Sequence, residues 1–166
     1  VRLGLVDRPS RQAVDPVLWR PAVDGPLLAV GGAASGRSSL AQLVAGQLGV
    51  PVIDREDALW DALLEPGPLV VDDLDLQLAR LGEEHQAAVG HLLARRMRER
   101  APVALTARRV SSAMSQLASL AEARVLLRIA SRQEHIVAGG AGQLHDATLP
   151  PGAGWMGDER VQLAMP

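Results

Sequence analysis

Residues 27–40 read LLAVGGAASGRSSL: an apolar run, a loop of small residues, and the start of a second apolar pattern. The apolar run predicts a buried strand, and the apolar residues after the loop recur at helical spacing, which predicts a helix. From Gly31 to Ser38 the loop follows the phosphate-binding pattern G-x-x-x-x-G-K-[ST], except that arginine takes the place of lysine. The pattern favours a strand–loop–helix unit that binds a nucleotide.

The chemistry of this loop identifies candidate phosphate ligands. Small residues let successive backbone N–H groups turn inward, and the helix that follows adds its positive N-terminal end. The Ser38 hydroxyl is placed to bind Mg²⁺. The predicted nucleotide-binding residues of the loop are Gly31, Gly32, Ala33, Ala34, Ser35, Gly36, Arg37, Ser38 and Ser39. A plain strand–turn–helix connection without a ligand is the alternative.

A second motif follows in residues 68–73 (PLVVDD), an apolar strand that ends in two carboxylates. Nucleotide-hydrolysing proteins use such an acidic strand to hold Mg²⁺. We therefore predict Asp72 as a metal ligand with Ser38, and Asp72 and Asp73 as catalytic candidates. The alternative is that these aspartates cap the next helix.

The 166 residues suffice for one domain with a hydrophobic core. No apolar run approaches the ~20 residues of a membrane helix, and because the first residues lack a basic-then-apolar pattern we expect no secretory leader. Because the chain begins with Val1, we expect it to be a fragment of a larger polypeptide. It has no cysteine, which excludes disulfides and cysteine-ligated metals.

The formal net charge of −2 argues against a dedicated nucleic-acid surface. The one basic cluster, residues 95–100, ends a predicted helix, where cations face the negative end of the helix dipole. We expect a solvated helix end there, with a phosphate or partner contact as the alternative. The four histidines show no metal-ligand spacing, and we expect each to be exposed or hydrogen-bonded: His85, His91, His135 and His145.

Strands and helices alternate along the chain. We expect an extended strap over residues 1–26 and one domain over residues 27–166. Beyond the phosphate loop, the predicted strands are 50–54, 68–71, 103–106, 124–129 and 161–164, and the predicted helices are 56–64, 83–98 and one that follows Ser111–Ser112. This order predicts an α/β fold with a parallel sheet of about five strands and helices on both faces. The phosphates would lie at the carboxyl ends of the strands.

Further motifs carry a family resemblance. Residues 3–9 (LGLVDRP) with Gln12 look like a strap that precedes a phosphate loop, and residues 106–109 (TARR) look like a Thr-Gln-Arg-Pro sensor segment. The later motifs are 125–131, 134–139 (EHIVAG), 150–154 (PPGAG) and 161–164 (VQLA). In this order the motifs resemble the FtsK/SpoIIIE-type P-loop ATPases over nearly the whole chain, and most closely a C-terminal ATPase module of the type VII secretion proteins EccC and EssC.

The resemblance implies a RecA/FtsK-like P-loop fold that binds ATP and Mg²⁺, and it adds Thr106 to the nucleotide-binding residues. It implies a parent protein with several ATPase modules at the cytoplasmic face of the membrane, assembled as a hexameric ring. The last module of such proteins docks a small helical secreted protein through its C-terminal signal. The implied partners are therefore the other modules and that substrate. Trp60 and Trp155 are candidate exposed aromatic residues, with partial core packing as the alternative.

The departures from the family pattern are informative. Arg37 replaces the lysine that bridges the phosphates, and Asp73 replaces the glutamate that orients the attacking water. Ala107 stands at the sensor glutamine and Ala153 at a late arginine. Loss of groups that act in the transition state depresses hydrolysis more than binding. We therefore expect weak or absent turnover with some nucleotide affinity.

Two alternatives stay open. In the first, the chain is a working ATPase that drives DNA or protein translocation, and Arg108 or Arg109 reaches a neighbouring subunit as an arginine finger. In the second, the chain is a structural module that binds no nucleotide.

Overall fold

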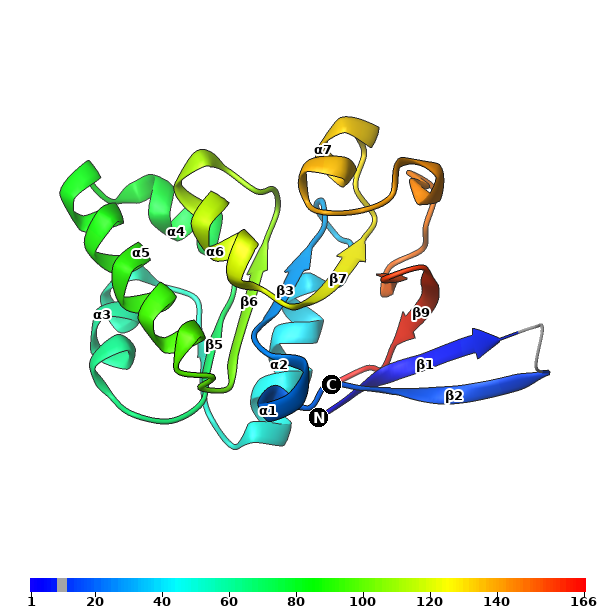
Figure 1. Ribbon diagram of the computed structural model, residues 1–166, viewed down its shortest axis with the longest axis horizontal. Coiled ribbons are helices and arrows are strands. Elements are labelled where there is room, and N and C mark those ends of the chain that lie inside the picture. The colour runs from blue at the N-terminus through cyan, green and yellow to red at the C-terminus, as the bar shows by residue number, and fades with distance from the viewer. Residues whose placement is uncertain (9–11) are drawn as a thin grey trace.

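The computed structural model describes residues 1–8 and 12–166, which form one mixed sheet with helices on both faces (Figure 1). The strand order in this described part is β2-β1-β9-β8-β7-β3-β6-β5-β4. Pro9 of the predicted strap motif lies outside the described residues. Within them, no helix has the length and apolar character needed to cross a membrane.

One half of the sheet is parallel, as predicted. It consists of β7 (Ala123–Leu127), β3 (Leu27–Val30), β6 (Val103–Ala107), β5 (Leu69–Val71) and β4 (Val52–Ile53). The phosphate-loop strand β3 is central, and β6 separates it from the acidic strand β5. Because these strands are parallel, the carboxyl ends of β3, β5 and β6 lie close together on one side of the sheet.

The other half is antiparallel, so the prediction of about five strands, all parallel, was wrong. It consists of β8 (Ala153–Met156), β9 (Glu159–Leu163), β1 (Arg2–Arg8) and β2 (Ala13–Leu18), which bring the described strands to nine. Antiparallel neighbours need only a tight turn, not a helical crossover. The β8–β9 turn, at residues 157–158, extends the sheet in this way.

The first 26 residues contribute β1, β2 and the short helix α1 (Pro21–Asp24). In Figure 1 the β1–β2 hairpin lies beyond β9, away from the α3–α6 helices. Arg8 fastens it, since its guanidinium bonds to Asp15 of β2 and Glu159 of β9, both at 2.6 Å. The edge strand β2 contains Pro16, and the opposite edge strand, β4, is only two residues long and follows Pro51.

The strand β3 shows why both faces carry helices. Alternate residues of a strand point to opposite faces, and all four residues of β3 are buried. Leu27 and Ala29 pack with Leu40 and Val44 of helix α2 (Arg37–Leu48) on one face.

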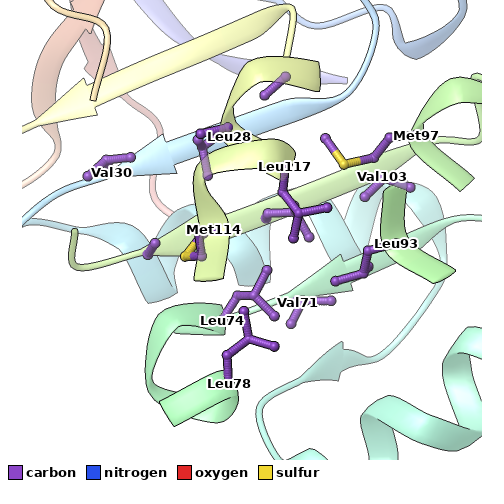
Figure 2. Close-up of a cluster of buried hydrophobic side chains, with 14 of the residues drawn as sticks. Leu28, Val30, Val71, Leu74, Leu78, Leu93, Met97, Val103, Met114 and Leu117 are labelled. Carbon is purple, nitrogen blue, oxygen red and sulfur yellow. The ribbon is translucent and has the colours of Figure 1, made fainter. Parts of the chain in front are cut away.

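Leu28 and Val30 belong to the second core, on the other face (Figure 2). The remaining helices are α3 (Glu56–Leu64), α4 (Leu74–Arg80), α5 (Glu83–Arg98), α6 (Ser115–Leu120) and α7 (Arg132–Val137), with single 3₁₀ turns at Ser112–Met114 and Gly142–Leu144. Side chains from α4, α5 and α6, among them Leu74, Leu93 and Leu117, fill this core. The predicted bounds 56–64 and 83–98 match α3 and α5.

Candidate functional site

The predicted phosphate loop joins β3 to α2. Gly36 stands before the first residue of α2 with φ of +106°, a conformation that favours glycine. A Cβ at Gly31 would lie 2.5 Å from Ser35 Oγ and 2.8 Å from Leu127 Cβ, so no larger residue fits there. The strand–loop–helix unit expected from the sequence is therefore present, and its two end glycines are required by its geometry.

Two backbone donors of the loop bond to neighbouring strands of the sheet. Gly31 N–H donates to the Ala107 carbonyl of β6 (3.1 Å), and Gly32 N–H donates to the Arg128 carbonyl after β7 (2.7 Å). These two groups anchor the loop to the sheet. The N–H groups of residues 37–39, in the first turn of α2, have no acceptor among the described residues. They are the donors that would face an anion.

Arg37 turns back onto its own loop. Its side chain is 6% exposed, and Nη1 donates to the carbonyls of Gly31 and Gly32, the latter at 2.9 Å. Its Nη2 lies 2.7 Å from Asp73 Oδ1. The guanidinium is thus held by two carbonyls of the loop and by a carboxylate of the acidic strand.

The two predicted acidic residues lie at the end of β5. Thr106 of β6 joins them: its hydroxyl donates to Asp72 Oδ1 (2.5 Å) and accepts from the Asp73 N–H (2.9 Å). Thr106 is 2% exposed, so in this structure it positions the two aspartates rather than facing solvent. Buried Gln77 of α4 donates to the Asp72 carbonyl (2.7 Å) and to the Ile53 carbonyl (3.1 Å), which ties the end of β5 to β4.

Asp73 is the most constrained of these residues. It adopts φ of +48°, in the left-handed region, where a residue other than glycine costs about 1–3 kcal/mol. One carboxylate oxygen pairs with Arg37, and the other lies 3.5 Å from Arg108 Nη2. Both carboxylate oxygens are therefore already engaged by guanidinium groups of this chain.

The metal prediction named Ser38 and Asp72. Ser38 is exposed at the start of α2, and Asp72 is half-buried with one carboxylate oxygen bonded to Thr106. Hydroxyl and carboxylate oxygens are ligands that Mg²⁺ accepts, so these residues fit the ion chemically. The surroundings fit a nucleotide only in part, because Arg37 bonds to the loop itself.

Two residues that the sequence analysis did not assign to the site, Arg128 and Gly152, also bond to the loop. Arg128 Nη2 donates to the carbonyls of Ala33 (3.1 Å) and Ala34 (3.2 Å). Gly152 N–H, in the predicted PPGAG turn, donates to the Ser35 carbonyl (2.8 Å). Position 128 follows a buried strand, at the sheet edge where ligands bind, and that placement was the available signal.

A pocket of about 550 Å³ opens beside the loop, on the β6 side. Its lining includes Leu76 and Ala79 of α4 and the exposed Arg108 and Arg109. The Arg108 N–H donates to the buried Asp75 carboxylate (3.0 Å). Ala107, at the predicted sensor position, is fully buried and offers no side chain to this pocket.

Arg96 and Trp60, two residues singled out in the sequence, are both shielded from solvent to some degree. Arg96, expected at a solvated helix end, is 6% exposed and donates to the carbonyls of Ala62, Glu65 and Gly67 at the end of α3. Burial lowers its pKa from the ordinary value. Trp60 is half-buried, with its ring edge-on to His85 (5.9 Å between centroids).

Of the four histidines, His135 is the buried one. Its side chain is 2% exposed, and Nε2 has no hydrogen-bond partner among the described residues. His85 and His91 are exposed, and His145 Nε2 bonds to the Ile129 carbonyl (2.9 Å). His135 lies on the short helix α7, and the motif EHIVAG does not show which face of that helix is covered.

The fold can now be compared with known proteins. No protein-family model matches the sequence, and no curated protein matches it. Solved structures do match. The EccC of Thermomonospora curvata (ATPases 2 and 3, in complex with a signal sequence peptide) superposes with a TM-score of 0.75 at 18% identity, over 99% of this chain and 42% of that chain.

A second match is EssC (ATPases 2 and 3) of Geobacillus thermodenitrificans, with a TM-score of 0.74 at 14% identity, over 99% of this chain and 44% of that one. The chain has the fold of the ATPase domains of type VII secretion proteins. The resemblance expected from the sequence is therefore confirmed for the fold.

The cytoplasmic domain of the Thermomonospora curvata type VII secretion ATPase EccC gives a TM-score of 0.71 at 16% identity, over all of this chain and 26% of that one. The chain thus spans less than half of each of these solved chains.

Proposed function

We propose that this chain is an ATPase module of a type VII secretion-type motor that hydrolyses ATP weakly or not at all and serves as a docking or regulatory platform. The pairing of Arg37 with Asp73 carries the proposal. These two residues replace the lysine and the glutamate of the active pattern. Their pairing neutralises the carboxylate that would act on water and holds the cation that would act on phosphate.

The remaining site chemistry supports binding rather than turnover. The first-turn N–H groups of α2 and the exposed Ser38 hydroxyl keep the means to bind a phosphate group. When bound, Mg²⁺ would offset phosphate charge, and Asp72 with Ser38 would hold it. Ala107 brings no polar group to the γ-phosphate position. The platform would sit beside other modules of one polypeptide at the cytoplasmic face of a membrane.

The partner in this proposal is a small helical export substrate that docks through its C-terminal signal. Docking is supported by the fold shared with EccC, whose solved structure holds a signal sequence peptide. Fluorescence anisotropy tests it, with C-terminal peptides of small helical proteins encoded beside the gene. We expect binding by one such peptide and none by a scrambled peptide of the same composition. Equal weak binding of both would contradict docking.

Turnover is tested with ATP and Mg²⁺. We expect a rate indistinguishable from that of the Asp72→Ala variant. A measurable rate that Asp72→Ala abolishes would favour the second candidate, a working FtsK-like ATPase. The exposed Arg108 and Arg109 at the mouth of the pocket favour that candidate, because they are placed to reach a neighbouring subunit.

A further inference from the structure

Residues 132–149, here called the α7 cap, form a wall beside the phosphate loop. On the entry side, Arg128 donates to the Ala33 and Ala34 carbonyls, and its Nη1 lies 3.4 Å from the Leu149 carbonyl of the cap. On the exit side, Gly152 donates to the Ser35 carbonyl. The residues that flank the cap at both ends therefore bond to the phosphate loop, and they connect the cap to the loop.

His135 lies at the centre of the cap. It is 2% exposed, and a Cβ at Gly140 would lie 2.2 Å from its Nε2, so the backbone closes over that nitrogen. Leu126 of β7 lies on the same side, since its Cδ1 would lie 2.6 Å from that Cβ. The His145 ring meets the His135 ring edge-on, with 5.6 Å between centroids. A neutral imidazole with an unprotonated Nε2 fits this space, whereas an added proton would meet no acceptor.

The charges around His135 oppose its protonation. Burial lowers its pKa, His145 lowers it further, and a hydrogen bond with the Ala141 backbone acts in the other direction. Arg124 of β7 donates to the Ala138 carbonyl and contacts Gly139, and Arg132 of α7 donates to the Gly142 carbonyl.

The two acidic residues nearest in the sequence do not compensate. Exposed Glu134 lines the pocket beside the phosphate loop, and the Asp146 carboxylate accepts from the hydroxyl and the backbone N–H of Thr148. No hydrogen bond or ion pair within the described part of the chain joins a carboxylate to His135. Protonation therefore adds a third cation to a region that already holds Arg124 and Arg132.

We propose that the α7 cap is a proton-sensitive clamp on the phosphate loop and that His135 is its sensor. Above the ordinary histidine pKa of about 6.5, His135 is neutral in the closed and open cap alike. As the pH falls below that value, the open cap takes up the proton and the closed cap does not, so opening becomes more favourable. The loop then loses the wall that Arg128 and Gly152 fasten.

Hydrogen exchange resolved by peptide tests the clamp. Between pH ~7.5 and ~5.5 we expect exchange in residues 132–149, corrected for the intrinsic rate, to rise about tenfold, with a smaller rise in residues 33–39. His135→Gln should lose this acid response. His91→Gln, a change at an exposed histidine of α5, should keep it.

An acid response in His135→Gln equal to that of the unchanged chain would overturn the proposal. A histidine NMR titration of the unchanged chain provides a second measurement that does not depend on the variant folding. A pKa for His135 at or above the ordinary value of about 6.5 would overturn it as well.

Discussion

Arg37 and Asp73 lie 36 positions apart in the sequence, and their charged groups approach to 2.7 Å where the phosphate loop meets the acidic strand. Each departs from the residue that an active enzyme of the resembled family carries. The two changes therefore form one structural unit, which makes their joint effect on stability and binding testable.

Asp73→Asn should destabilise the chain by about 2 kcal/mol. The substitution leaves Arg37, which is only 6% exposed, without its carboxylate partner, and a buried charge stripped of its partner is costly. Urea unfolding measures the loss. Asp57→Asn is the matched control, because the Arg55–Asp57 pair is about two-thirds exposed and solvent screens its attraction, so the loss there should be much smaller. Equal losses in the two variants would show that the buried pair contributes no more to the free energy of unfolding than the exposed pair does.

Arg37→Lys should tighten the binding of Mg²⁺–ATP by about tenfold, or about 1.4 kcal/mol. An ammonium cannot reproduce the planar fork that bonds to Gly31, Gly32 and Asp73 together, so the side chain is released toward the ligand. Calorimetric titration measures the affinity. Addition of Ser38→Ala should remove the gain, and an affinity unchanged by Arg37→Lys would show that the arginine does not limit binding.

Thr106→Val should cost about 1–2 kcal/mol, although valine has nearly the same shape. The change removes the hydroxyl that bonds to Asp72 and to the Asp73 N–H, both near the end of a buried strand. Thr148→Val, at an exposed turn where the hydroxyl bonds to Asp146, should cost less than about 0.5 kcal/mol. A neutral Thr106→Val would mean that water replaces the hydroxyl.

Arg96→Ala should cost about 2–3 kcal/mol, because the guanidinium satisfies three carbonyls at the end of α3 and its stem is buried. Arg98→Ala, two positions along the same helix and exposed, should stay within about 0.5 kcal/mol. Thermal unfolding of both variants distinguishes a buried cap from the solvated helix end that composition suggested.

The parts of the fold that the sequence predicted are those that local pattern specifies. The loop from Gly31 to Ser38 and the helices at 56–64 and 83–98 follow from spacing within a short window. The antiparallel half does not. Its strands are not shorter than those of the parallel half, but β1 pairs with β9 across some 150 positions, and contacts such as Arg8–Glu159 leave no trace in local periodicity.

The candidate site divides in the same way. The loop and the two aspartates could be located from motifs, but the direction in which Arg37 points could not. It depends on where β5 places Asp73, and therefore on the order of strands in the sheet. The burial of His135 depends on the backbone of Gly140 folding over it, which no residue pattern within α7 encodes.

The two edge strands of the sheet, β2 and β4, are built in a way that limits pairing between neighbouring domains. An exposed strand offers unpaired N–H and carbonyl groups to any other strand, and tethered copies meet at high local concentration. At one end Pro16 removes a donor from β2, and at the other β4 stops after two residues. Sheets finished in this way can follow one another along one polypeptide, or crowd together in an assembly, without annealing into a continuous aggregate.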